Sequence, residues 1–384
     1  MLRFNQKDII NWLNQFDFNI KKTHNARFMD QKVTPDVLSS VSEAIIECKP
    51  NEPFRINDIR YCDYANYIVT SIFNKPSIEL VPNEYDKFFS QPIKTLAYAK
   101  ILEEIKDGNR NFYKINNYEL LEYISLSDRK AYEFLSLYIE KVLRDSGIWE
   151  LFENFLNNQT TESFYFLKDK FDEFILTYTP INQKIEIHRI FAKILNILAF
   201  KYKTKGTIKG RLSDKIINYD DLLYNRINWR DINKPKNIPR KLFIQNFEFT
   251  PSYNYLVQKA KRYVKKIHQF SEIHPFPNYP ATQYHHIFPQ SNFPEIADVP
   301  ENIIALTPNQ HYFRAHPNNN TNLIDKDYQK LCLICKLHSI EYDYVMQNNY
   351  YNLSNFVDVI NIGYEVGLSK NISFEELKHW IIAF

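Results

Sequence analysis

Residues 282–317 constrain the fold of this chain most, because they combine strand, loop and helix signals with four of its ten histidines. Residues 284–288 read as a strand ended by a proline, and residues 302–307 form a second, β-branched run. Thr307 is a good helix N-cap residue, and Pro308 after it suits the first helical position. The stretch therefore predicts two strands joined by a loop and followed directly by a helix.

Four polar residues are placed so that this local fold can bring them together. His285 and His286 lie near the end of the first strand, and Asn302 follows sixteen positions after His286. His311 comes nine positions after Asn302, in the first turn of the helix. Neighbouring strand residues point to opposite faces, so the adjacent histidines can serve one phosphate only at a strand end or bend. Phosphodiester hydrolysis requires a base and positive charge; a histidine can take a proton from water near neutral pH, and a divalent ion can supply the charge.

The pattern resembles that of the HNH, or ββα-metal, nuclease family. In that family a His-His or Asp-His pair ends one strand, an Asn begins the next, and a His or Asn lies in the following helix; the similarity covers about a tenth of this chain. It implies that His286 is the general base and that His285 and His311 bind one divalent metal ion. It also implies that Asn302 holds the loop carrying the base through hydrogen bonds. Magnesium (Mg2+) is the expected ion, and manganese, nickel or zinc would also suit two imidazole ligands.

The chain departs from the family pattern at one position of the helix. Some relatives carry a further metal ligand four residues along from the first, where this chain has Ala315. His316 lies one position further along, and we keep it as a candidate catalytic residue. The alternative is a histidine that faces the C-terminal end of the helix, where the helix dipole favours positive charge.

The rest of the chain is expected to be mostly helical. Only six glycines among 384 residues, against 27 tyrosines, favour helices with aromatic cores. Apolar spacing typical of helices is found in residues 93–105, 117–143 and 185–200. The expected fold class is mainly α (α+β). The expected organisation is a multi-helical DNA-recognition domain at 1–200, a basic segment at 201–249 and an HNH nuclease domain with C-terminal helices at 250–384.

A second nuclease pattern is present near the N-terminus. Pro35 and Asp36, with Glu47 and Lys49 further on, match the PD-(D/E)xK pattern of a different nuclease class. That chemistry needs Glu47 and Lys49 on a strand beside Asp36, whereas the apolar residues between them have helical spacing. We therefore expect only a helix start and a helix end here, and a PD-(D/E)xK nuclease is the less favoured alternative.

The cysteines and apolar residues bear on the cellular setting. Cys332 and Cys335 form a single C-x-x-C inside a helical pattern, which favours buried free cysteines over a zinc site. Cys48 and Cys62 lie far away and supply no second pair for such a site. Four cysteines without a regular framework fit a reducing, cytoplasmic setting. The chain has no hydrophobic signal sequence and no apolar run of membrane-spanning length, so we expect no membrane partner.

Positive charge is concentrated in one part of the chain. Residues 201–268 contain 17 Lys and Arg against 5 Asp and Glu, although the whole chain has a net charge of only +3. Such asymmetry indicates a surface that binds a polyanion, which the nuclease resemblance implies is double-stranded DNA; the alternative is a solvated linker. A glycine-containing basic loop is expected to contact phosphates through Lys203, Lys205, Lys209 and Arg211. The aromatic and basic run after it is expected to contact base edges through Arg226, Asn228 and Arg230. A basic helix is expected to lie against the duplex with Arg262, Lys265 and Lys266.

Three classes of function fit these patterns. The first is a sequence-specific type II restriction endonuclease, including the type IIS kind that cuts at a shifted distance. It would act on double-stranded DNA, with a cognate DNA methyltransferase in the same restriction-modification system and the option of dimerising on the DNA. The second is another HNH nuclease, either homing, modification-dependent or nicking. The third is a non-catalytic DNA binder, which the intact His286 disfavours.

Overall fold

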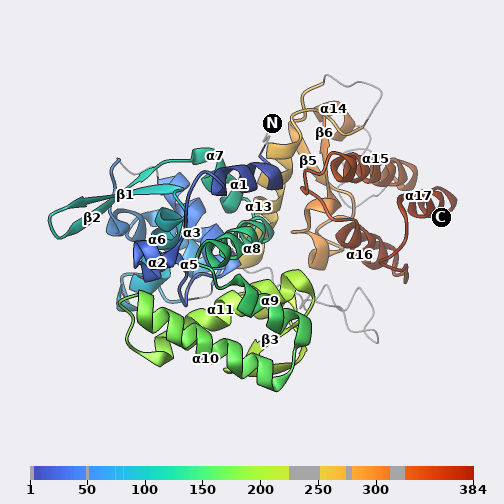
Figure 1. Ribbon diagram of the computed structural model, residues 1–384. Coiled ribbons are helices and arrows are strands. Elements are labelled where there is room, and N and C mark those ends of the chain that lie inside the picture. Colours follow the sequence, from blue (N-terminus) through green and yellow to red (C-terminus); the bar gives the residue numbers. More distant parts are fainter. Residues whose placement is uncertain are drawn as a thin grey trace. The chain divides into compact units, whose positions relative to one another are not determined.

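The computed structural model describes most of the chain, in the ranges 4–48, 52–73, 75–80, 82–224, 251–273, 279–311 and 325–384. These residues are mainly helical, as the scarcity of glycine predicted, and their strands form two-stranded antiparallel hairpins. No helix in the described ranges combines the length and the apolar character needed to cross a membrane. The chain forms two compact units, Gln6–Arg226 and Ile227–Phe384 with Met1–Asn5 (Figure 1).

The first unit is a set of helices packed around α3 (Pro35–Cys48). Eleven of the 14 residues of α3 are buried, because small serines alternate with its apolar residues and let other helices pack on several sides. The helices that contact α3 are α4 (Ile56–Arg60), α5 (Asp63–Ser71), α6 (Asp86–Tyr98), α7 (Tyr118–Ser125) and α8 (Asp128–Asp145). The other helices of this unit are α1 (Gln6–Leu13), α2 (Ile20–Thr23), α9 (Trp149–Asn158), α10 (Thr161–Tyr178) and α11 (Lys184–Tyr202).

Helix α3 excludes the PD-(D/E)xK pattern as a metal site. Asp36 lies in its first turn and Glu47 in its last, so the two carboxylates are about 16 Å apart along one helix axis. Asp36 is buried, and it accepts hydrogen bonds from Thr34 Oγ1 at 2.6 Å and from the Tyr224 backbone N–H at 2.7 Å. The expected helix start and helix end are confirmed, and the PD-(D/E)xK alternative is wrong.

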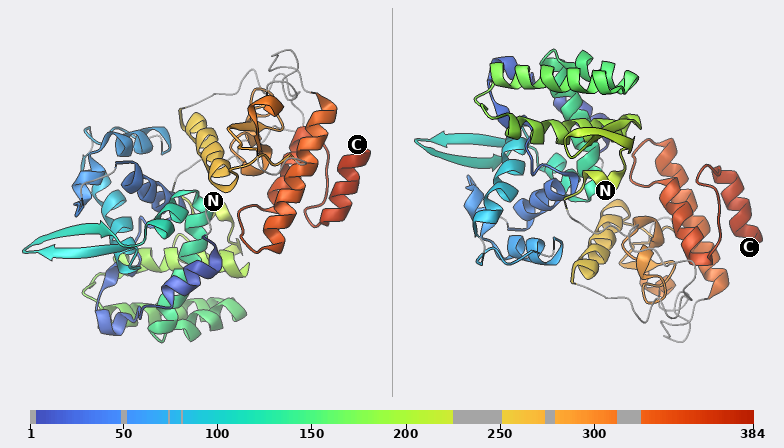
Figure 2. Two further views of the ribbon diagram at one scale, coloured as in Figure 1. Left: turned by 90° about the horizontal axis from the view of Figure 1, so that it is seen from above. Right: turned by 90° about the horizontal axis from the view of Figure 1, so that it is seen from below.

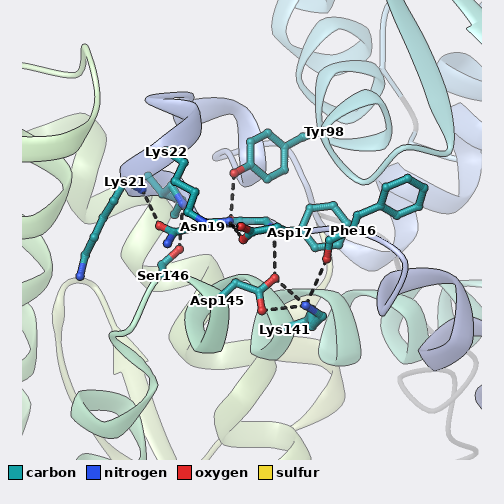
Figure 3. Close-up of polar contacts among 11 residues, drawn as sticks. Phe16, Asp17, Asn19, Lys21, Lys22, Tyr98, Lys141, Asp145 and Ser146 are labelled. Carbon is teal, nitrogen blue, oxygen red and sulfur yellow. Dashed lines mark hydrogen bonds and ion pairs between the residues drawn. The ribbon is translucent and has the colours of Figure 1, made fainter.

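The segment before and within α2 is fastened to the C-terminal end of α8 (Figure 3). Asp145 Oδ2 accepts a hydrogen bond from the Phe18 backbone N–H at 2.9 Å, and Ser146 Oγ accepts one from the Ile20 backbone N–H at 3.0 Å. Lys141 Nζ lies 2.6 Å from Asp145 Oδ2. Backbone N–H groups that have no helical partner of their own are thereby satisfied by side chains of α8.

Residues 93–105 differ from the helix that their spacing predicted. Helix α6 ends at Tyr98, and β1 (Leu102–Asp107) pairs with β2 (Arg110–Ile115) in a hairpin that extends away from the helices of its unit (Figure 2). Gly108 has a positive φ of 56° in the turn. The sequence feature that signals this hairpin is the Asp107–Gly108 pair, which favours a tight turn and which the helical spacing concealed.

The second unit contains a small hairpin and several helices. Strands β5 (Gln283–His286) and β6 (Ile303–Leu306) are antiparallel, with His286 opposite Ile303 and His285 opposite Ile304. Helix α14 (Pro308–Gln310) follows β6 with one residue between them. The other helices are α13 (Pro251–Ile267), α15 (Lys326–Val345), α16 (Leu353–Tyr364) and α17 (Phe374–Ala383).

The hairpin shares its hydrophobic core with the C-terminal helices. Ile287 and Phe288, which follow β5, are buried together with Leu333 of α15 and Phe356 of α16. The ring of Phe288 lies so close to Gly363 of α16 that a Cβ on this glycine would be 2.3 Å from it. A hairpin with strands of only four residues can bury little apolar surface by itself. Helices α15, α16 and α17 therefore supply most of the hydrophobic core against which β5 and β6 pack.

The four cysteines divide into two pairs. Cys332 and Cys335 are buried free cysteines in α15, as expected, and burial raises the pKa of the Cys332 thiol. Cys48, at the end of α3, forms a disulfide with Cys62, which precedes α5, and their Cα atoms are 6.2 Å apart. The cysteine pattern indicated no disulfide. The structure corrects this, because α3, α4 and α5 pack together and bring two sequence-distant cysteines side by side.

Candidate active site

The start of α14 fixes the position of His311. Thr307 Oγ1 accepts a hydrogen bond from the Gln310 backbone N–H at 3.2 Å, and Gln310 Oε1 accepts one from the Thr307 backbone N–H at 2.9 Å. Ser271 Oγ donates a further hydrogen bond to Gln310 Oε1 at 2.6 Å. The helix start predicted at Thr307 is confirmed, and this capping box holds His311 close to the end of β6.

His285 and His311 form a pair of neighbouring imidazoles. Both side chains are half-buried, and their ring centroids are 5.2 Å apart with an interplanar angle of 74°. Two imidazole nitrogens that bind one ion at about 2.1 Å place their ring centroids up to about 6 Å apart, so the observed spacing fits a shared metal ion. Within the described ranges no group of three or more His, Cys, Asp or Glu side chains is gathered in this way. The pair by itself supplies two of the ligands that a divalent ion requires.

His286 is buried and is held in one tautomer. Its Nε2 lies 2.9 Å from the Ala297 carbonyl oxygen, which can only accept, so Nε2 donates and the lone pair is on Nδ1. Burial, followed by the positive charge of Lys261, lowers the pKa of His286 to about 4, against the opposing effect of the Ala297 hydrogen bond. The ring is therefore neutral near pH 7 and able to accept a proton, and an anion placed beside it would raise this pKa.

Asn302 holds both ends of the segment that follows β5. It is fully buried, and its Oδ1 accepts a hydrogen bond from the Phe288 backbone N–H at 2.9 Å. Its Nδ2 donates to the carbonyl oxygens of Phe288 at 3.1 Å and Ile296 at 3.2 Å. Ile296 immediately precedes Ala297, whose carbonyl orients His286. Asn302 thus fixes the Ile296 carbonyl, and the next carbonyl along the chain, that of Ala297, orients His286. These hydrogen bonds are of the kind that the sequence led us to expect for Asn302.

A buried ion pair connects β6 to α15. Glu272 Oε1 accepts a hydrogen bond from the Ala305 backbone N–H at 2.8 Å, and Lys336 Nζ of α15 lies 2.8 Å from Glu272 Oε2. The Lys336 side chain has no exposed surface. Removing one partner of such a pair leaves an uncompensated buried charge, so the pair helps to hold β6 to α15 through Glu272.

Helix α13 carries positive charge on the second unit. Among its predicted DNA contacts, Arg262 and Lys265 are exposed and Lys266 is half-buried. Lys261, by contrast, is half-buried and lies near enough to His286 to lower its pKa. The sequence interpretation missed Lys261 because it treated the lysines of α13 as one basic face. The sequence did contain a signal for this position. Lys261 follows Val257 by four residues, which places both side chains on the same side of the helix, and Val257 is buried.

The loop predicted around Gly206 and Gly210 is a β-hairpin of the first unit. Strands β3 (Lys205–Ile208) and β4 (Arg211–Ile216) meet at Lys209 and Gly210, whose φ angles are 51° and 78°. Gly206 is buried in β3, where an added Cβ would lie 2.5 Å from Asn196 Oδ1 of α11. This glycine therefore permits close packing against α11, and its expected approach to a phosphate is wrong.

The basic candidates of this region differ in accessibility. Lys203, Lys209 and Arg211 are exposed on or beside the hairpin, and Lys205 is half-buried. Their exposure leaves them free to meet a polyanion, although it does not distinguish DNA from other partners. The remaining candidates, Arg226, Asn228, Arg230 and the catalytic candidate His316, lie outside the described residues.

Comparisons of the chain with protein-family models, with curated proteins and with solved structures found no match.

Proposed function

We propose that this chain is a metal-dependent endonuclease of the HNH, or ββα-metal, class. The observation that carries the proposal is the state of His286, a buried neutral imidazole whose Nε2 is committed to the Ala297 carbonyl and whose Nδ1 can accept a proton. It adjoins His285, whose ring lies beside that of His311. Two strands followed by a helix start supply these three histidines in the order that the family pattern requires.

Each residue has a distinct part in this proposal. A divalent ion bound by His285 and His311, most simply Mg2+, would supply positive charge at the phosphate and at the leaving oxygen. Nδ1 of His286 accepts the proton of the attacking water. Asn302 positions His286 by holding the Ile296 peptide, next to the carbonyl that orients the ring.

More particularly, we propose a type II restriction endonuclease acting on double-stranded DNA. Residues 201–268 have a surplus of Lys and Arg that suits a polyanion, with 17 basic against 5 acidic residues. The exposed lysines and arginine of the β3–β4 hairpin belong to the helical first unit, which would read the target. An endonuclease that acts without a partner protein needs a DNA-recognition domain of its own, because contacts to phosphates carry no sequence information.

The test is to digest plasmid DNA of known sequence, unmodified and methylated, with Mg2+ and with EDTA. Discrete fragments from unmodified DNA that vanish in EDTA are expected. Cleavage confined to methylated DNA would indicate a modification-dependent nuclease, and nicked circles alone would indicate a nicking enzyme. Failure to cut any substrate with any divalent ion would refute the nuclease proposal.

The same digest should be repeated with a matched pair of histidine variants. His286→Ala should lose about a hundred- to ten-thousandfold in rate, as removal of a general base does. His379→Ala, on an exposed face of α17, should cut like the wild type. If His286→Ala cuts within tenfold of the wild type, another residue is the base.

A further inference from the structure

Helix α13 presents one face to the loop that orients His286. Tyr253 and Val257, four residues apart on α13, form a buried cluster with Ala297. Ala297 is the residue whose carbonyl accepts the hydrogen bond from His286 Nε2. Lys261 lies four residues beyond Val257, about 6 Å further along the helix, and shares this face with it. Its side chain is therefore directed toward the neighbourhood of His286.

Contacts of the whole helix support the same placement. Helix α13 packs against both strands of the hairpin, β5 and β6. Lys261 thus belongs to a helix that packs against the small hairpin carrying His285 and His286, although α13 ends at Ile267, well before the hairpin begins at Gln283.

Among the described residues, the Lys261 side chain has no carboxylate partner of the kind that the buried Lys336 has. It is half-buried, and burial alone lowers the pKa of its ammonium group. Within the described ranges it forms no ion pair, whereas the fully buried Lys336 lies 2.8 Å from a Glu272 carboxylate oxygen. A partly desolvated cation without a carboxylate is costly for the folded protein, and an incoming anion would offset that cost.

We propose that Lys261 binds a non-bridging oxygen of the scissile phosphodiester, beside His286. This assignment rests on the proposed nuclease function. In the reaction the oxygen of water bonds to phosphorus, and one proton of the water passes to Nδ1 of His286. The bond from phosphorus to the leaving sugar oxygen breaks with its electron pair on that oxygen, which then takes a proton from solvent water. Lys261 keeps its protons throughout. It stabilises the negative charge that gathers on the phosphate oxygens, where a fixed donor is most effective.

The test compares Lys261→Met, which keeps the apolar stem, with Lys261→Arg, which keeps the charge. The matched control is Lys378→Met, on a half-buried lysine of α17 in the same unit. Single-turnover cleavage at saturating DNA should fall about a hundredfold in Lys261→Met, as on loss of one transition-state donor. Lys261→Arg should recover to within about tenfold of the wild type, the control should cut normally, and none of the three should melt at a lower temperature than the wild type.

Two results would overturn the proposal while leaving the nuclease function intact. One is a Lys261→Met variant that cuts within threefold of the wild type. The other is an equal loss in the Met and Arg variants accompanied by equal losses of thermal stability, which would identify a packing role.

Failure of the nuclease function itself would be recognised separately, by a wild-type protein that cuts no DNA. DNA binding in EDTA over a range of salt concentrations then decides the matter. Loss of one phosphate contact should lower the slope of log affinity against log salt by about 0.9 in Lys261→Met. An unchanged slope, or a wild type that does not bind DNA, would overturn the contact.

Discussion

Replacing Asn302 with alanine should loosen the segment that orients His286. The change removes three hydrogen bonds and leaves the buried Phe288 N–H without its acceptor, at a cost of about 1–3 kcal/mol. The Phe288 and Ile296 carbonyls each lose a donor, at about 1 kcal/mol apiece. Because costs within one network do not add fully, we expect a local loss of about 3 kcal/mol. That corresponds to about a hundredfold less protection from hydrogen exchange, since each 1.4 kcal/mol is a factor of ten.

Hydrogen exchange followed by mass spectrometry, together with the rate of DNA cleavage, measures this effect. Asn361→Ala is the matched control, because Asn361 Nδ2 donates to the Leu368 carbonyl at 3.0 Å and its Oδ1 accepts from the Leu368 N–H at 2.7 Å. Faster exchange in residues 288–297 and slower cleavage are expected for Asn302→Ala alone. The reasoning is refuted if Asn302→Ala keeps its protection within threefold, or if Asn361→Ala slows cleavage as much.

Three further predictions concern other parts of the chain. His285→Ala and His311→Ala should each raise the divalent-ion concentration needed for half-maximal cleavage by at least about tenfold; unchanged metal titrations for both would exclude them as ligands. Gly363→Ala should destabilise the second unit by about 1–3 kcal/mol in denaturant, because its Cβ would meet an aromatic ring at 2.3 Å. Gly367→Ala, which meets nothing within 4 Å, is its control, and equal stabilities of the two variants would contradict the packing argument. Lys209→Ala should weaken binding to every duplex alike and lower the salt slope by about 1, whereas an unchanged slope would place the hairpin away from DNA.

Local signals in the sequence predicted the hairpin and the helix start of the second unit well. The β-branched run and the Thr307-Pro308 pair depend on backbone preferences within a few residues, and β6 and α14 form where these preferences indicate. The burial of Cys332 and Cys335 followed from helical spacing for the same reason. In each case the information needed was contained in about one turn of helix or one short strand.

What the sequence did not predict depends on contacts between distant segments. The disulfide of Cys48 and Cys62 requires three helices to pack together, and the packing role of Gly206 depends on α11 passing beside β3. The proposed role of Lys261 depends on α13 packing against Ala297, which lies more than thirty residues further along the chain. None of these contacts leaves a pattern along the sequence. The helical spacing of residues 93–105 also hid the β1–β2 hairpin, which the Asp107–Gly108 pair could have indicated.

The Glu272–Lys336 pair limits how the second unit could be shortened or transplanted. A fragment that stopped after α14 would retain His285, His286 and Asn302. It would, however, leave the buried Glu272 carboxylate without Lys336, its ion-pair partner. If the second unit is the nuclease that we propose, its smallest portable form therefore extends at least through α15, and a fusion that grafts this hairpin onto a DNA-binding domain must carry that helix with it. In this chain the boundary of a transferable module is fixed by a lysine more than twenty residues beyond the last histidine with a proposed metal-binding role.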